Sequence, residues 1–108
     1  METILWIDDM REPPNDTDYI WLKSVNEAKQ KIIDIENGND QSGYTEIALI
    51  DIDHDAGDYA HDGGDYIRLL DWLEETGKKY PIKIHSMNTV GRQNMRAIIR
   101  HNKWTEIQ

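Results

Sequence analysis

The chain has 108 residues, of which 38 % are hydrophobic, and a formal net charge of −9. This length fits a single domain over residues 1–108 with one modest core. The absence of cysteine excludes disulfides and thiolate metal sites, and no apolar run approaches the about 20 residues of a membrane span. Because the sequence also begins without a signal-peptide pattern, we expect a cytoplasmic protein that does not associate with membranes.

The acidic charge limits the classes of partner. There are 21 acidic and 12 basic residues, and the basic ones form no run. Proteins gain affinity for duplex nucleic acid by neutralising phosphates with Lys and Arg, so we expect no non-specific duplex binding. A small phosphorylated ligand or nucleotide stays compatible with this charge if a divalent cation or a few arginines offset the acids. The oligomeric state is left open.

Short apolar runs alternate with helical patterns along the chain, which is typical of buried parallel strands. The first two runs predict strands over residues 3–9 and 19–23, joined by a loop over residues 10–18. This loop is shorter than the dozen or so residues of a usual parallel crossover. The second strand is therefore either antiparallel to the first or joined to it by an irregular crossing.

A helix is predicted next, because Ser24 and Glu27 have the spacing of a capping box and Gly38 is a natural stop. Its apolar positions fall on one face: Val25, Ala28, Ile32 and Ile35. A third strand is predicted over residues 46–52, followed by an Asp- and Gly-rich loop over residues 54–64.

In the last part of the chain, Asp65 is expected to cap a second helix that ends at Gly77. A fourth strand follows at residues 82–84, and a third helix starts at residue 88 or 89. A short edge strand near residues 104–107 ends the pattern. Several further side chains are expected in the core or half-buried: Trp6, Trp21, Trp72, Met87 and Met95.

Polar clusters follow three of these strands, at residues 8–9, 51–55 and 85–88. Ligands of such sheets bind at the carboxyl ends of the strands, so neighbouring strands would bring these clusters into one pocket. Asp8 and Asp9 are adjacent carboxylates that either bind a divalent cation such as Mg²⁺ or form a turn. Arg11 is either a salt-bridge partner or a phosphate clamp.

The second cluster nearly matches a calcium loop over residues 51–62. The match fails because Ala56 stands where glycine is required, Asp62 stands where a bidentate Glu is expected, and a strand rather than a helix precedes it. We therefore do not expect an EF-hand.

The third cluster suits an anion. Ser86 and Asn88 can hydrogen-bond a phosphate, and Arg92 stands in the first turn of a helix, where a cation is unfavourable unless an anion lies nearby. The alternative is that Asn88 only caps the helix and His85 is a satisfied core histidine.

Taken in order, these residues resemble the cyclic-phosphate processing receiver-like family, which is related in fold to the receiver domains of response regulators. The resemblance is carried by residues 5–11, 53–57, 64–66, 71–74 and 85–95. It implies an α/β fold, a receiver-like (flavodoxin-like) three-layer sandwich with a mostly parallel sheet of about four to five strands, about three helices and a reduced first crossover.

The resemblance also implies a divalent metal, Mg²⁺ or Mn²⁺, held by Asp8, Asp9 and Asp53. In receivers an Asp on the third strand accepts a phosphoryl group, and Asp53 and Ser86 match receiver positions. Two features are not those of a receiver: the added histidines, and the lack of a counterpart for the Lys of the fifth strand. A phosphorelay is therefore not the expected function.

The expected function is a phosphoesterase acting on a cyclic phosphate, either a nucleotide 2′,3′-cyclic phosphate or a cyclic-nucleotide signal. Two sets of residues carry this prediction. The catalytic candidates are His54, His85, Asp53 and Asp55, and the phosphate-binding candidates are Arg11, Ser86, Asn88 and Arg92. Imidazoles titrate near neutral pH and suit an acid and a base; in a variant, they bind a transition metal directly.

The alternative is a non-catalytic receiver-like module that binds a nucleotide or a protein partner. The small size and acidic charge suit a stand-alone protein of a bacterium or a phage.

Overall fold

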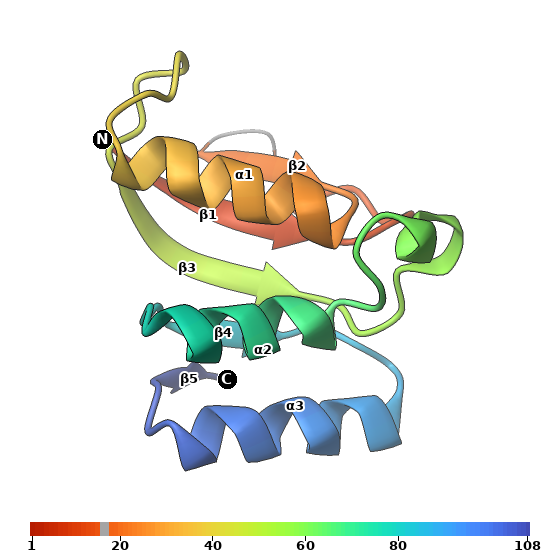
Figure 1. Ribbon diagram of the computed structural model, residues 1–108. Coiled ribbons are helices and arrows are strands. Elements are labelled where there is room, and N and C mark those ends of the chain that lie inside the picture. Colours follow the sequence, from red (N-terminus) through yellow and green to blue (C-terminus); the bar gives the residue numbers. More distant parts are fainter. Residues whose placement is uncertain (16–17) are drawn as a thin grey trace.

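The computed structural model describes residues 1–15 and 18–108, so residues 16–17 of the predicted loop lie outside the description. Strands and helices alternate along the chain after the first two strands (Figure 1). The strands are β1 (Glu2–Ile7), β2 (Tyr19–Leu22), β3 (Glu46–Ile52), β4 (Ile82–Ile84) and β5 (Glu106–Ile107). The helices are α1 (Val25–Glu36), α2 (Ile67–Thr76) and α3 (Thr89–His101), with a short 3₁₀ helix, η1 (Gly57–His61).

The strands form one sheet in the order β2-β1-β3-β4-β5, and every neighbouring pair is parallel. This is the flavodoxin-like order, so the predicted receiver-like α/β fold is confirmed. The pairing of Leu5 with Ile20 is part of a parallel register between β1 and β2. The connection between them is therefore the irregular crossing and not an antiparallel return.

The helices lie side by side on one face of the sheet (Figure 1). Helix α1 contacts α2, and α2 contacts α3. Parallel crossovers are right-handed, so the connections β2-α1-β3, β3-α2-β4 and β4-α3-β5, which all advance in the same direction, place their helices on the same face. The described residues thus form two layers instead of the three that the resemblance implies, because no helix is found in the described part of the β1–β2 connection.

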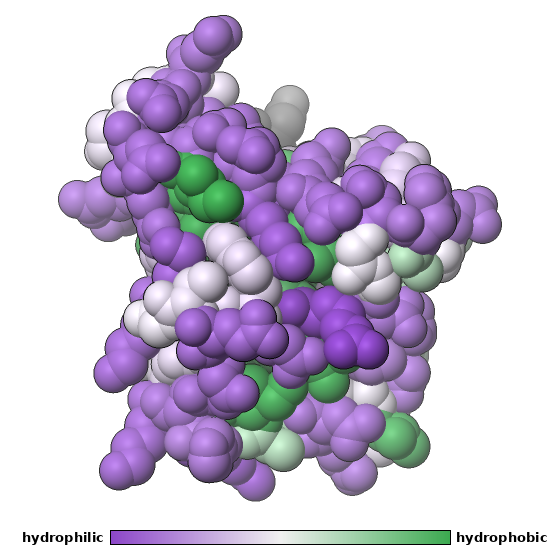
Figure 2. Space-filling model, viewed as in Figure 1, coloured by the Kyte–Doolittle hydropathy of each residue, from purple (hydrophilic) through white to green (hydrophobic). Residues whose placement is uncertain are grey.

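The core lies between this helix layer and the sheet. It contains the strand residues Leu5, Ile7, Ile50 and Ile52 together with apolar residues of all the α-helices. Trp6 is only 7 % exposed but is not part of that cluster, because alternate strand residues point to the opposite face. Viewed from the helix side, the surface is mostly hydrophilic (Figure 2).

Of the N-caps predicted for the first two helices, one is confirmed and the other is wrong. Ser24 caps α1 as predicted, accepting a hydrogen bond from the Glu27 backbone N–H. The prediction that Asp65 caps the second helix is wrong: α2 begins at Ile67, and the Asp65 carboxylate accepts the backbone N–H of Ala56 instead. This contact holds the long loop after β3 against the start of α2.

The structure also places two other residues of the sequence predictions, Asp62 and Met87. Asp62, the last position of the near-calcium loop, accepts hydrogen bonds from Ser24 and Asn26 and so ties this loop to the start of α1. Met87, expected in the core, is 86 % exposed, because it lies in the turn between β4 and the N-cap of α3. None of the helices within residues 1–15 and 18–108 has both the length and the apolar character needed to cross a bilayer.

Candidate functional site

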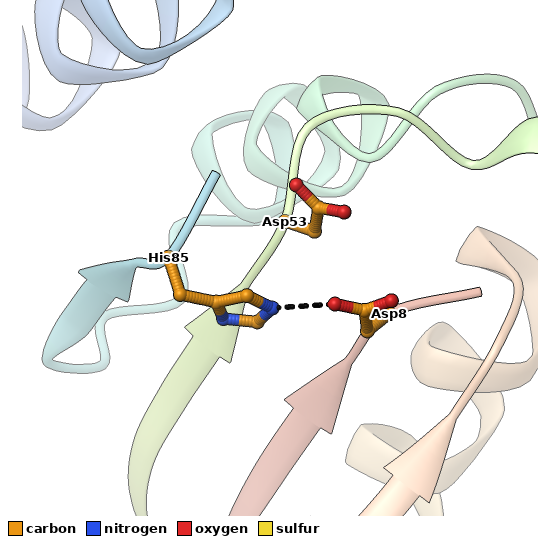
Figure 3. A group of neighbouring side chains, drawn as sticks. All are labelled: Asp8, Asp53 and His85. Carbon is orange, nitrogen blue, oxygen red and sulfur yellow. Dashed lines mark hydrogen bonds and ion pairs between the residues drawn. The ribbon is translucent and has the colours of Figure 1, made fainter. Parts of the chain in front are cut away.

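Three side chains meet at the carboxyl edge of the sheet, each directly following a different strand (Figure 3). They are Asp8 after β1, Asp53 after β3 and His85 after β4, and one potential ligand atom of each lies within 4.8 Å of the other two. The strand order reverses between β1 and β3, the point where ligands bind in open α/β sheets. The predicted convergence of the strand-end clusters is therefore observed for these residues.

Asp8 is held by its own turn. Its Oδ1 accepts the backbone N–H groups of Met10 and Arg11, both at 2.9 Å, and its Oδ2 lies 2.9 Å from His85 Nε2. Burial alone would raise the pKa of the Asp8 carboxyl, but the backbone N–H groups of Arg11 and Met10, together with His85, hold it below its ordinary value. Asp8 is thus fixed in its anionic form at neutral pH.

His85 is held from both sides of its ring. Its Nδ1 lies 2.7 Å from Asp51 Oδ1, opposite the contact of Nε2 with Asp8. The imidazole also stacks on the indole of Trp6, with ring centroids 4.0 Å apart and planes 2° apart. The ring is therefore fixed in position and in tilt.

Asp51 is a site residue that the sequence prediction missed. It is only 3 % exposed and lies within β3, and although it belongs to the second polar cluster it was not among the predicted catalytic, phosphate-binding or metal-binding residues. The signal that was available is the period of two along a strand, which puts Asp51 on the same face as Asp53.

Arg11 forms salt bridges in this structure. Its guanidinium Nη2 lies 3.7 Å from Asp53 Oδ2, and its Nε lies 3.5 Å from Asp8 Oδ2. The side chain is 52 % exposed, so these contacts are weak and the guanidinium can turn to another anion.

Asp9 lies beside this group but not in it. The group in the structure is Asp8, Asp53 and His85. The predicted ligand set, in contrast, had Asp9 in place of His85. The pKa of Asp9 is raised by burial and by the negative charges of Asp8, Asp53 and Asp58, although a backbone hydrogen bond opposes the change. A site that repels one of its own carboxylates in this way favours a bound cation.

A second group forms around His54, which follows Asp53 in the chain. His54 Nδ1 lies 2.8 Å from Asp55 Oδ1, and the Asn88 side-chain amide lies 3.5 Å from the same ring nitrogen. The ring packs against Gly91 of α3, where an added Cβ would lie 2.4 Å from His54 Cγ. The Asp53 carboxylate accepts the His54 backbone N–H at 2.8 Å, which joins the two groups.

The remaining phosphate candidates lie around the start of α3. Ser86 is buried, and its Oγ accepts the Asn88 backbone N–H, while Asn88 Oδ1 accepts the Gly91 N–H as the predicted N-cap. Arg92 Nη1 lies 3.5 Å from the Ser86 backbone oxygen. The structure thus joins Ser86 and Arg92 to the start of α3, where the Asn88 side chain reaches His54.

The donor set fits a divalent cation. Two carboxylate oxygens and one imidazole nitrogen suit Mn²⁺ and other transition metals, and carboxylates with water suit Mg²⁺. Asp8 and Asp53 are 1 % and 7 % exposed, so their charges are poorly screened by solvent. A cation here would neutralise a cluster that Arg11 neutralises only in part.

The chain was compared with protein-family models, curated proteins and solved structures. Residues 3–101 match the family model described as the cyclic-phosphate processing receiver domain. No curated protein and no solved structure matches. Because the family model covers most of the chain, the chain belongs to the cyclic-phosphate processing receiver domain family.

Proposed function

We propose that this domain is a phosphoesterase that opens a cyclic phosphate with the help of a divalent cation. The observation that carries the proposal is the buried group of Asp8, Asp53 and His85 at the switch point of the sheet, to which the His54 backbone N–H is bonded through Asp53. The family description supports the cyclic phosphate as the substrate.

In the proposed site, Asp8, Asp53 and His85 hold the cation, either Mg²⁺ or Mn²⁺. When bound, it supplies positive charge to the phosphoryl oxygens and lowers the pKa of a bound water. Arg11 can add a second positive charge, because its present salt bridges are long and half exposed to solvent. Ser86, Asn88 and Arg92 offer further donors on the His54 side.

The reaction is a hydrolysis. A water oxygen forms a bond to phosphorus, the bond from phosphorus to one ring oxygen breaks, and that oxygen takes up a proton, leaving a phosphate monoester. His54 is the proposed general base that removes the proton from the water, oriented by Asp55 at 2.8 Å. The same imidazole, now protonated, can return the proton to the leaving oxygen.

One observation favours the non-catalytic alternative. Both ring nitrogens of His85 already pair with carboxylates, so the network of Asp51, His85 and Asp8 is complete without an ion. A module that only binds a nucleotide or a protein partner would need no more than this. The two functions differ in whether product is formed.

The test is a panel of nucleoside 2′,3′-cyclic and 3′,5′-cyclic monophosphates incubated with the protein and Mg²⁺, Mn²⁺ or EDTA, with products separated by chromatography. We expect a monoester product that needs the cation and falls at least about 100-fold in His54→Ala, the range for loss of a general base. His101→Ala, at an exposed position of α3, is the matched control and should keep full activity. Unchanged turnover in His54→Ala would remove this residue from the mechanism, and no product from any compound would favour the binding module.

A further inference from the structure

A groove lies beside the candidate site, between the loop after β1 and strand β2. Its volume is about 560 Å³, within the range of pockets that hold small organic ligands. Two aromatic rings, two prolines, one carboxylate and one amide line it: Tyr19, Trp21, Pro13, Pro14, Glu12 and Asn15. None of the functional candidates described above lines this groove.

Residues of the groove wall are linked to the candidate site by direct contacts. The indole N–H of Trp21 donates to the backbone oxygen of Asp8 at 2.8 Å. Tyr19 meets the ring of Trp6 edge-on, with centroids 6.1 Å apart, and Trp6 stacks on His85. One row of rings therefore leads from the groove to the proposed cation ligands.

The loop that forms the groove also positions the site. The Trp6 indole N–H donates to the backbone oxygen of Arg11 at 2.8 Å and anchors the loop over the sheet. Arg11 points its guanidinium at Asp53, and the next residue, Glu12, lines the groove. A ligand held by Arg11 is thus one residue away from the groove wall.

The chemistry of the wall selects the occupant. Among the described residues, the groove wall includes no Lys or Arg, and its charged residue is Glu12, so a phosphate is disfavoured there. Aromatic side chains stack well on nucleobases, and a carboxylate accepts hydrogen bonds from ring N–H or amino groups. The Lys23 ammonium lies 4.5 Å from the Trp21 ring centroid, a cation–π contact at one face of the indole.

We propose that this groove binds the nucleobase of a nucleotide whose phosphate occupies the Asp8, Asp53 and His85 site. The inference rests on the proposed function for the position of the phosphate, and it narrows the substrate to nucleotides. A base with an exocyclic amino group, as in adenine, guanine or cytosine, matches the carboxylate of Glu12.

The experiment measures binding apart from catalysis. Adenosine 2′,3′-cyclic monophosphate and glycerol 1,2-cyclic phosphate, which has the same ring but no base, are titrated by calorimetry with Mn²⁺ present into His54→Ala, which lacks the proposed general base. We expect the nucleotide to bind about 5- to 150-fold more tightly, the gain that one stacked base provides. Equal affinity, or no binding of either compound, would overturn the proposal.

Variants assign the gain to the groove. Trp21→Ala should bring the two affinities together, with Trp72→Ala as an aromatic control on helix α2. Trp21 also donates a hydrogen bond to Asp8, so its loss can disturb the candidate site itself. Glu12→Gln, at an exposed loop position, is therefore a second variant that leaves the fold intact. It should also reduce the preference for the nucleotide. A preference that survives in both variants would place the base elsewhere and contradict the proposal.

Failure of the groove and failure of the proposed function give different results. Turnover of both cyclic phosphates at equal efficiency would keep the phosphoesterase and remove the base site. Binding with the expected preference but no turnover with Mn²⁺ would keep the base site and remove the enzyme. If the wild-type protein sediments as a dimer and Trp21→Ala sediments as a monomer, the groove is a contact with a second copy of the chain. This result would overturn the base site.

Discussion

The position of the His85 imidazole is fixed by several contacts at once. Carboxylates hold both ring nitrogens, and the ring stacks on Trp6. An imidazole that binds a metal through one nitrogen commonly donates its other N–H to a carboxylate, which fixes its orientation and raises its basicity. Asp51 fits this positioning role, with Nε2 directed at the candidate cation site.

The role of Asp51 can be tested by Asp51→Asn, which keeps the size of the side chain. We expect the affinity for Mn²⁺ to fall about 10- to 100-fold, because the amide no longer provides a full negative charge to the imidazole. Mn²⁺ binding is measured by electron paramagnetic resonance, with the half-buried Asp71→Asn as the control on helix α2. An unchanged Mn²⁺ affinity would show that Asp51 has only a structural role.

Asp9 provides a prediction on pH. Its pKa is raised in the folded protein by burial and by neighbouring acids, so its ionisation costs stability at neutral pH. Asp9→Asn should raise the free energy of unfolding of the metal-free protein at pH 7 by up to about 1 kcal/mol. The gain should vanish as the pH falls below the ordinary carboxyl value of 3.8, where Asp9 is protonated in both states.

Urea unfolding at pH 7 and at pH 3, with EDTA present, measures this difference. Glu75→Gln, at an exposed position of α2, is the control for loss of one negative charge. Destabilisation by Asp9→Asn at pH 7 would mean that the carboxylate makes favourable contacts that outweigh the repulsion.

At the scale of elements, the start of α3 and the loop after β3 fit one another. Gly91 lies in the first turn of α3, and the imidazole of His54 occupies the space that a side chain there would need. The close approach sets where His54 lies, and Asn88 caps the same helix. The proposed base is therefore positioned by helix packing and not by the loop alone.

Gly91→Ala should therefore destabilise the protein. In an ordinary helix the same change stabilises by about 1 kcal/mol, whereas here the new Cβ meets the His54 ring and overpacking costs about 1–3 kcal/mol. The double variant with His54→Ala should recover most of this loss, a coupling that thermal unfolding can measure. Stabilisation by Gly91→Ala alone would show that His54 moves away without cost.

Much of this arrangement was predictable at the element scale. Apolar periodicity located the helices and strands, and the position of Asp8 and His85 after apolar runs predicted that they would meet. The failure of Asp65 to cap α2 could not be predicted, because the backbone N–H of Ala56, nine residues earlier, takes that carboxylate. Met87 was wrongly assigned to the core because sequence does not reveal which way a turn residue points.

At the scale of the whole molecule, the sheet carries helices on one face and the site on its edge. The resemblance to receivers implied a third layer, although the loop predicted over residues 10–18 was already too short for the helix that receivers have between their first two strands. Trp6 and Trp21 lie on the face of the sheet without helices, and they connect the groove to the candidate site. A loop in place of a helix thus leaves room for a ligand next to the carboxylates.

A bound cation should stabilise the whole domain. At a concentration about 100 times its dissociation constant, Mn²⁺ adds about 2.7 kcal/mol, which raises the melting temperature of a domain of this size by on the order of 10 °C. The rise should be absent in Asp53→Asn. A melting temperature that Mn²⁺ leaves unchanged in the wild-type protein would contradict the assignment of Asp8, Asp53 and His85 as cation ligands.

In the proposed function, this site opens a cyclic phosphate with the help of a cation. The most direct measurement is ³¹P NMR of adenosine 2′,3′-cyclic monophosphate with the protein, first with Mg²⁺ and then with excess EDTA, for the wild type and His85→Ala. We expect the cyclic-phosphate signal to give way to a monoester signal only in the wild type with Mg²⁺. Ring opening that continues in His85→Ala, or in EDTA, would contradict it.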